Sequence, residues 1–254
     1  MMRDFTIDTL TTLYKEMKKN GFLFSTLSEY YINKPLDTFV ILRHDVDRNE
    51  HNALHIAKLE KSLHIKASYY FRCKKGKFEE STIKEISSLG HEIGYHYETL
   101  AKANGIYHEA FTMFKAELCR LREIAQIKTI CAHGSPLSKW DSRSIWSIYN
   151  FHDLGILGEP YISIDYNKVL YLTDTGRKWN GSNVSIRDKV ISNLTYNYQS
   201  TFNIIQAIMS HSIPTRIMLN IHPHRWNNSH LPWMWEYVGQ NFKNILKWVI
   251  IKAR

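Results

Sequence analysis

Short apolar runs alternate along the chain with longer stretches in which apolar residues recur at helical spacing. The runs are rich in β-forming residues and predict buried strands at 38–42, 67–71, 92–96, 128–132, 161–165, 168–172 and 215–221. The helical stretches are two pieces within 4–32, a helix from the expected cap Asn49 to Leu63, and helices near 79–89, 106–126, 200–211 and 233–249. Strands that alternate with helices indicate a mainly parallel sheet, so the pattern predicts an α/β fold.

Polar clusters follow several of the predicted strands. In parallel α/β sheets, ligands bind where loops leave the carboxyl ends of the strands. We therefore expect the chemistry of the protein at these clusters, which are His44-Asp45-Val46-Asp47, Gly90 to His96, His133 to Pro136, and Asn220 to Trp226.

Asp45 and Asp47 stand two apart at the end of an apolar strand. Extended backbone places their side chains on one face, where two carboxylates are costly unless a cation or another partner neutralises them. One interpretation makes one of them a metal ligand and the other a general base. The alternative is a pair of loop carboxylates that Arg43 or Arg48 bridges.

Histidines end the other clusters or lie within them, at His96, His133 and His222. Imidazole is a common metal ligand at neutral pH, although a single histidine in a strand is more often a hydrogen-bonded core residue. Cys131 and His133 also allow a thiol nucleophile with an imidazole base, against the simpler interpretation of a buried cysteine beside a loop histidine. Taken together, one carboxylate and two imidazoles suit Zn, Fe, Mn or Co, and three protein ligands leave room for a reactive water.

Composition narrows the range of partners. The formal net charge is +9 at pH 7, but the Lys and Arg residues are scattered, so we expect no nucleic-acid partner. An anionic carrier, such as a nucleotide or a lipid phosphate, stays open. Three cysteines without a CxxC spacing argue against a disulfide framework. We find no signal peptide and no apolar run of membrane-spanning length, which favours a cytoplasmic protein without a membrane span.

The order of these motifs resembles that of the polysaccharide deacetylase superfamily, the NodB-homology group of carbohydrate esterases that includes family 4. That group has an acidic motif after its first barrel strand, a Gly-His-Glu-Ile-Gly-x-His segment, an Arg/Pro loop, an Asp/Trp segment and a final strand that ends in a histidine. The resemblance spans residues 38–226, and GHEIGYH is its most specific segment. The counterparts here are Asp45 and Asp47, Gly90 to His96, His133 to Pro136, Thr173 to Trp179, and His222.

The resemblance implies a distorted (β/α) barrel with seven or eight strands, formed by one domain over 1–254 with extra helices at 1–35. It implies one divalent transition metal, with zinc expected first and Fe, Mn, Co or Ni as alternatives. It also implies hydrolysis of an N- or O-linked acetyl group on a sugar or glycan. Asp45 is then the general base and His222 the general acid, with Asp174 in support, while Asp47 and His96 bind the metal. The substrate-binding candidates are Tyr97, Arg177, Trp179 and Trp226.

The chain also departs from the pattern of this group. Val46 separates the two aspartates that are usually adjacent, and the arginine of the third motif is absent. Leu100 stands where the second metal-binding histidine is expected, and a leucine cannot bind a metal. We therefore expect His133 as the third ligand, with Glu98 or His44 as alternatives. Two other functions stay open, an amidohydrolase of small non-sugar amides and a metal-free carbohydrate-binding or scaffold protein.

Overall fold

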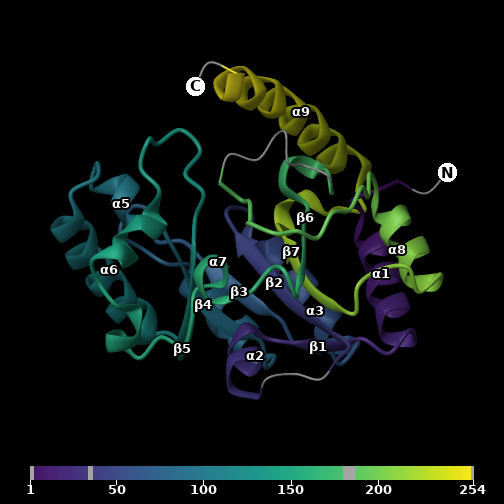
Figure 1. Cartoon of the computed structure of the whole chain (residues 1–254), viewed down its shortest axis with the longest axis horizontal. Helices are drawn as coiled ribbons and strands as arrows, with labels where there is room; N and C mark the ends of the chain where they lie inside the picture. The colour runs from purple at the N-terminus through teal and green to yellow at the C-terminus, as the bar shows by residue number, and fades with distance from the viewer. Residues whose placement is uncertain (1–2, 34–36, 180–186, 253–254) are drawn as a thin grey trace.

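The computed structural model describes residues 3–33, 37–179 and 187–252, and helices surround a parallel sheet in its centre (Figure 1). Within these residues seven strands pair in the order β5-β4-β3-β2-β7-β6, with β1 beside β2. All of the pairings between them are parallel. The strands are β1 (Leu23–Ser25), β2 (Phe39–Val46), β3 (Ser68–Phe71), β4 (Glu92–Tyr97), β5 (Ile127–Ala132), β6 (Leu170–Thr173) and β7 (Arg216–Ile221).

The helices cover the outside of the sheet. In Figure 1, α5 and α6 lie on one side of the molecule, α1 and α8 on the other, and α9 crosses the end away from α2. The α-helices are α1 (Ile7–Lys19), α2 (Leu27–Asn33), α3 (Glu50–Ser62), α4 (Glu80–Ser88), α5 (Thr99–Lys102), α6 (Tyr107–Arg122), α7 (Pro160–Ser163), α8 (Thr201–Met209) and α9 (His230–Lys252). Short 3-10 helices are η1 (Ser142–Ser147), η2 (Phe151–Leu154), η3 (Thr175–Arg177) and η5 (Pro223–Arg225).

One face of the sheet encloses a core of its own. Phe39 of β2 and Tyr70 of β3 belong to the same buried cluster as Cys131 of β5 and Tyr171 of β6. Since β5 and β6 are the two ends of the strand order, the sheet must curl until these side chains meet, as in a barrel. The predicted α/β class with a curled parallel sheet is confirmed.

The central strand β2 carries the pattern that positions the site. All eight of its residues are buried, as expected for a strand covered on both faces. Alternate side chains point to opposite faces, so Arg43 and Asp45 continue the inner row that begins with Phe39 and Ile41. His44 belongs to the outer row, and its Nε2 lies 2.7 Å from a carboxylate oxygen of the buried Glu60.

Two sequence predictions of local structure were wrong, and one strand was missed. The segment predicted as a strand at 161–165 begins as α7, because the Glu159 side chain accepts from the Ile162 N–H and Pro160 suits a first helical turn. The two helical pieces predicted within 4–32 are present as α1 and α2, and the missed strand is β1 between them, whose three residues are too few to show an alternating pattern. Asn49 has a left-handed conformation (φ 55°) and does not cap α3 with its side chain.

The described part of the chain contains no helix with both the length and the apolar composition that crossing a membrane requires.

Gly94 allows β4 and the inner core to approach each other closely. A Cβ at this position would lie 2.2 Å from Cε1 of Tyr70, whose hydroxyl is held 2.7 Å from Oγ1 of Thr129. We predict that Gly94→Ala lowers the free energy of unfolding by about 1–3 kcal/mol, because the ring cannot give way without losing this contact. Urea denaturation measures the change. Gly239→Ala is the control, since no atom lies within 4 Å of the added carbon; equal stability of the two variants would contradict the prediction.

Candidate metal centre

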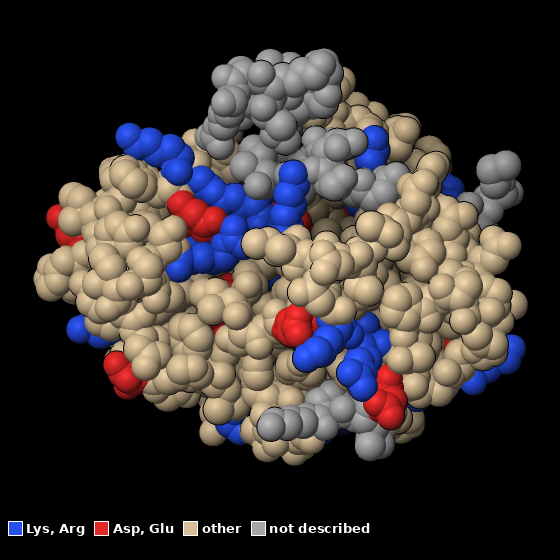
Figure 2. Space-filling model, viewed as in Figure 1, with Lys and Arg blue, Asp and Glu red and all other residues tan. Residues whose placement is uncertain are grey.

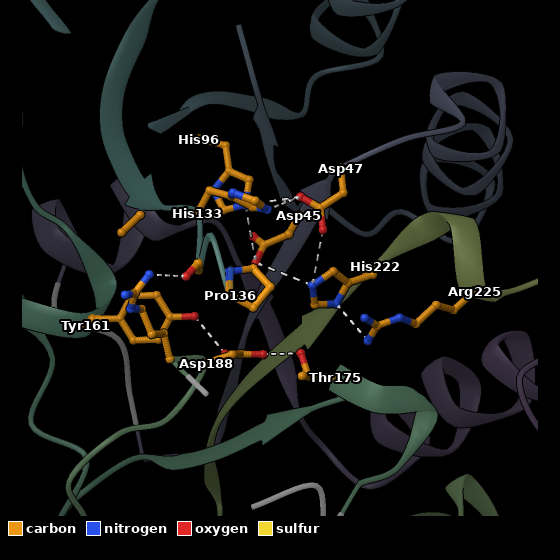
Figure 3. Close-up of a pocket in the computed structure, with 13 residues that line it drawn as sticks. Asp45, Asp47, His96, His133, Pro136, Tyr161, Thr175, Asp188, His222 and Arg225 are labelled. Atoms are coloured by element: carbon orange, nitrogen blue, oxygen red, sulfur yellow. Dashed lines mark hydrogen bonds and ion pairs between the residues drawn. The ribbon is translucent and has the colours of Figure 1, made fainter. Parts of the chain in front are cut away.

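The candidate site is a pocket at the carboxyl ends of β2, β4, β5 and β7 (Figure 3). The strands bring polar residues from distant parts of the chain to one place, as the strand-end argument predicts. Five of the lining residues were candidates from the sequence, namely Asp45, Asp47, His96, His133 and His222.

Asp47, His96 and His133 converge on one point of the pocket. Oδ1 of Asp47 lies 3.5 Å from Nε2 of His96 and 3.5 Å from Nε2 of His133. One ligand atom from each residue falls within 4.8 Å of the other two, which is close enough for a single ion. The third member comes from the end of β5, so the structure brings His133, rather than Leu100, beside His96; Leu100 is fully buried in the core.

Hydrogen bonds to the far side of each imidazole direct its Nε2 into the pocket. Nδ1 of His96 donates to the carbonyl oxygen of Cys131 at 3.0 Å. Nδ1 of His133 lies 2.8 Å from Oε2 of Glu98, and Arg72 donates to the same carboxylate at 2.8 Å. A proton on each Nδ1 leaves the Nε2 lone pair free, which is the arrangement that metal-binding histidines adopt.

These three residues fit a divalent transition metal. Oδ1 of Asp47 is buried and accepts no hydrogen bond from the described residues, so it is an acceptor without a donor. Burial alone would raise the pKa of Asp47, but the neighbouring His133, His96 and His222 hold it well below its usual value. One carboxylate with two neutral imidazoles is a donor set for Zn, Fe, Mn or Co.

The two alternative third ligands have other partners. Glu98 supports His133 from behind, and His44 faces Glu60 on the opposite side of β2. The thiol of Cys131 does not behave as an activated nucleophile, because burial raises its pKa well above the ordinary value. The structure therefore does not support the Cys131–His133 nucleophile as an alternative.

Asp45 lies beside the three-residue cluster and is tightly held. Arg43 donates to both of its oxygens, from Nε at 3.0 Å and from Nη2 at 2.8 Å, and Asn220 donates to Oδ2 at 3.1 Å. Burial would raise the pKa of Asp45, but Arg43 and the nearby His96 and His222 lower it, so the carboxylate is ionised at neutral pH. Arg43 therefore neutralises Asp45 alone, whereas the ion pairs of Asp47 are with the three histidines and Arg72, so the arginine bridge across both carboxylates that the sequence offered as an alternative is not formed among the described residues.

His222 faces the cluster from β7. Its Nε2 lies 4.0 Å from Oδ2 of Asp45 and 3.9 Å from Oδ2 of Asp47. Its Nδ1 lies 2.6 Å from Oδ1 of Asp174, a buried carboxylate that also accepts from Arg225 at 2.9 Å and from the indole of Trp226 at 2.7 Å. Asp174 thus fixes the ring so that Nε2 is the atom that reaches the pocket.

The structure places the four substrate-binding candidates away from the pocket lining. Tyr97 is buried and bonds to the indole of Trp146, and Trp179 is buried and donates to Thr201. Trp226 is also buried, beneath His222 and against Asp174. Arg177 lies over the ring of Trp233. Neither the aromatic character of Tyr97, Trp179 and Trp226 nor their positions in the sequence indicated that these side chains are buried.

Several lining residues were not among the candidates. Asp188 accepts from Tyr161 at 2.7 Å and from Thr173 at 2.8 Å, and it also contacts Thr175. Arg187 donates to the carbonyl oxygens of Gly134 and Ser135, so it holds the loop that follows His133. Neither residue directly follows a strand predicted from the sequence or belongs to a motif that the sequence analysis singled out. No local signal in the sequence could have identified them.

The chain matches no protein-family model, and no curated protein matches it by sequence. Solved structures do resemble it. A pseudoenzyme of carbohydrate esterase family 4 from Bacillus anthracis is 13% identical, with a TM-score of 0.45, and the match covers 82% of this chain and 62% of that one. A mutant pseudoenzyme of the same family, with restored enzymatic activity, is also 13% identical with a TM-score of 0.45, over 84% of this chain and 64% of its own length.

A family 4 carbohydrate esterase from Bacillus anthracis is 11% identical, with a TM-score of 0.41, and the match covers 92% of this chain and 85% of that one. The order of motifs in the sequence resembles the same family. The chain spans less than two thirds of the length of the pseudoenzyme structures.

Glu98 offers a direct test of the imidazole support. We predict that Glu98→Gln weakens zinc binding by about 10- to 100-fold, because the neutral amide holds the Nδ1 proton of His133 less strongly than a carboxylate. Competition with a chromophoric chelator measures the affinity. Glu80→Gln, at an exposed position of α4, is the matched control. Unchanged zinc affinity in Glu98→Gln would show that His133 needs no such support.

Proposed function

We propose that this protein is a metal-dependent hydrolase that removes an acetyl group from a sugar. The observation that carries the proposal is the position of Asp45 and His222 beside the cluster of Asp47, His96 and His133. A proton acceptor, a proton donor and a metal-binding set share one pocket. The resemblance of the motifs to the polysaccharide deacetylase superfamily supports an acetylated sugar as the substrate.

Asp47, His96 and His133 would hold the metal ion. When bound, such an ion supplies Lewis-acid chemistry, in which it polarises an acyl carbonyl and makes water more acidic. The orientation of both imidazoles by Cys131 and Glu98 prepares these donors before any ion arrives.

Asp45 would act as the general base. Arg43 and Asn220 fix its carboxylate and keep it ionised, so that an oxygen atom is ready to accept a proton from the attacking water. Because Arg43 uses both oxygens, the carboxylate has one orientation only. That orientation directs Oδ2 towards His222.

His222 would act as the general acid. Asp174 holds the Nδ1 side of the ring, so a proton carried on Nε2 can pass to the leaving amine or alkoxide. The contact of Asp174 with Nδ1 fixes the orientation of the ring, as an orienting carboxylate does in hydrolase triads. We therefore assign Asp174 a positioning role rather than a direct one.

Asp45→Asn tests the assignment of the base. We predict that this variant loses acetate release from acetylated amino-sugar oligomers by a factor of about 10²–10⁴, because an amide cannot accept the proton. Its metal content should equal that of the unmodified protein, since Asp45 lies outside the ligand set. Asp165→Asn, at an exposed loop position, is the control. Near-normal turnover in Asp45→Asn would contradict the role given to Asp45, and turnover of non-sugar amides alone would contradict the substrate class.

A further inference from the structure

The C-terminal helix α9 presents an apolar face to solvent. Leu231, Trp235, Val238, Phe242 and Ile245 follow one another at steps of four and three residues, so they lie along one side of the helix. Each of these side chains is exposed, with Trp235 at 73% and Phe242 at 64%.

The opposite side of α9 packs on the protein through Trp233, whose indole donates to the carbonyl oxygen of Asp4 at 2.7 Å, and through two buried amide side chains. Gln240 and Asn244 are only 4% and 6% exposed, and the Gln240 amide donates to Asn244 at 2.8 Å. Asn244 in turn donates to the carbonyl oxygen of Gly176 at 2.8 Å. A surface helix ordinarily turns its apolar stripe towards the core, so α9 has the reverse orientation.

This face stands out from the rest of the surface. Seven of the fifteen exposed large hydrophobic side chains among the described residues belong to α9. Isolated apolar side chains on a surface need no explanation, whereas a continuous stripe marks a site of interaction.

We propose that the apolar face of α9 binds the surface of an anionic membrane. A helix that lies in the plane of a lipid interface carries Trp, Phe and Leu on one face and basic residues elsewhere. The sequence of α9 contains three lysines and a single acidic residue, Glu236, which Arg48 pairs at 2.8 Å. The whole chain has a net charge of +9, and the face displayed in Figure 2 carries many Lys and Arg side chains with a few Asp and Glu side chains among them. This charge attracts anionic headgroups while the apolar stripe enters the layer below them.

A second copy of the chain fits the same face less well. The steps of four and three residues resemble a coiled-coil seam, but the positions that flank the seam hold Pro232, Met234, Gly239 and Asn241. Charged residues at those positions normally select the partner and the register. Two copies would also bring together two bodies of charge +9, which opposes their association and favours an anionic surface.

The inner side of α9, opposite its apolar face, contacts residues at the rim of the pocket. Glu236 of α9 is 3.8 Å from the imidazole of His224, and Asn244 bonds to Gly176, the neighbour of the pocket residue Thr175. The apolar face points away from these contacts, so a membrane bound there would lie on the other side of α9 from the pocket rim. The proposal concerns the helix alone and does not depend on the hydrolase reaction.

Cosedimentation of the full chain with lipid vesicles tests the proposal. We expect binding to vesicles of phosphatidylcholine mixed with phosphatidylglycerol, weaker binding to phosphatidylcholine alone, and loss of binding as salt is added. The double variant Trp235→Glu/Phe242→Glu should bind at least about tenfold more weakly, because it removes two apolar side chains from the interface and adds two negative charges. Ile191→Glu is the control, since Ile191 is 96% exposed elsewhere on the protein and its variant should bind as the unmodified chain does.

Thermal unfolding of each variant confirms that the fold is retained, which is expected because all three positions are exposed. Absence of binding to the anionic vesicles, or equal binding of the double variant, would overturn the proposal. Light scattering measures the oligomeric state of the unmodified chain and of the double variant. A dimer that the double variant abolishes, in a protein that ignores vesicles, would assign the face to a second copy instead.

Discussion

The site depends on two carboxylates that lie together at the end of a buried strand. An ionised carboxylate removed from water is strongly unfavourable unless opposite charge or hydrogen-bond donors surround it. Arg43 meets this need for Asp45, and the imidazoles of His96 and His133 approach Asp47. Arg43 lies on β2 itself, and the two histidines lie at the ends of β4 and β5. The curl of the sheet brings these strand ends, and with them the partners of both carboxylates, to one place.

The alternation of β2 connects the core to the pocket. The same inner row that buries Phe39 and Ile41 continues as Arg43 and Asp45. A shift of one residue in the pairing of β2 would turn Asp45 outwards and bring His44 into the pocket. The apolar half of the strand therefore specifies where the polar half points, and the large inner aromatic residues keep that register.

Much of the site could be predicted from the sequence because its members follow strands. Parallel strands deliver their carboxyl ends to one edge, so the residues after each apolar run were expected to meet, and the structure brings His133 to His96 as expected. The depth of side chains could not be predicted in this way. Trp179 and Trp226 contact Phe5, a residue far away in the sequence, and both rings are fully buried and absent from the pocket lining.

The features that the sequence did not reveal are positioned by tertiary contacts. Arg187 and Asp188 directly follow no strand predicted from the sequence, and their contacts in the pocket include the loop carbonyl of Gly134 and the hydroxyl of Tyr161. The reversed orientation of α9 is a further example. An apolar stripe ordinarily faces the core, but the inner side of α9 instead contacts the protein through Trp233 and through Asn244, which donates to the carbonyl oxygen of Gly176 in η3.

Metal analysis of the purified protein is the most direct test of the central claim, that Asp47, His96 and His133 form one ion-binding site. The account predicts about one transition-metal ion per chain after reconstitution, loss of that ion in His133→Ala, and its retention in His108→Ala, where the histidine is exposed on α6. Absence of metal from the unmodified protein, or full retention in His133→Ala, would contradict the account.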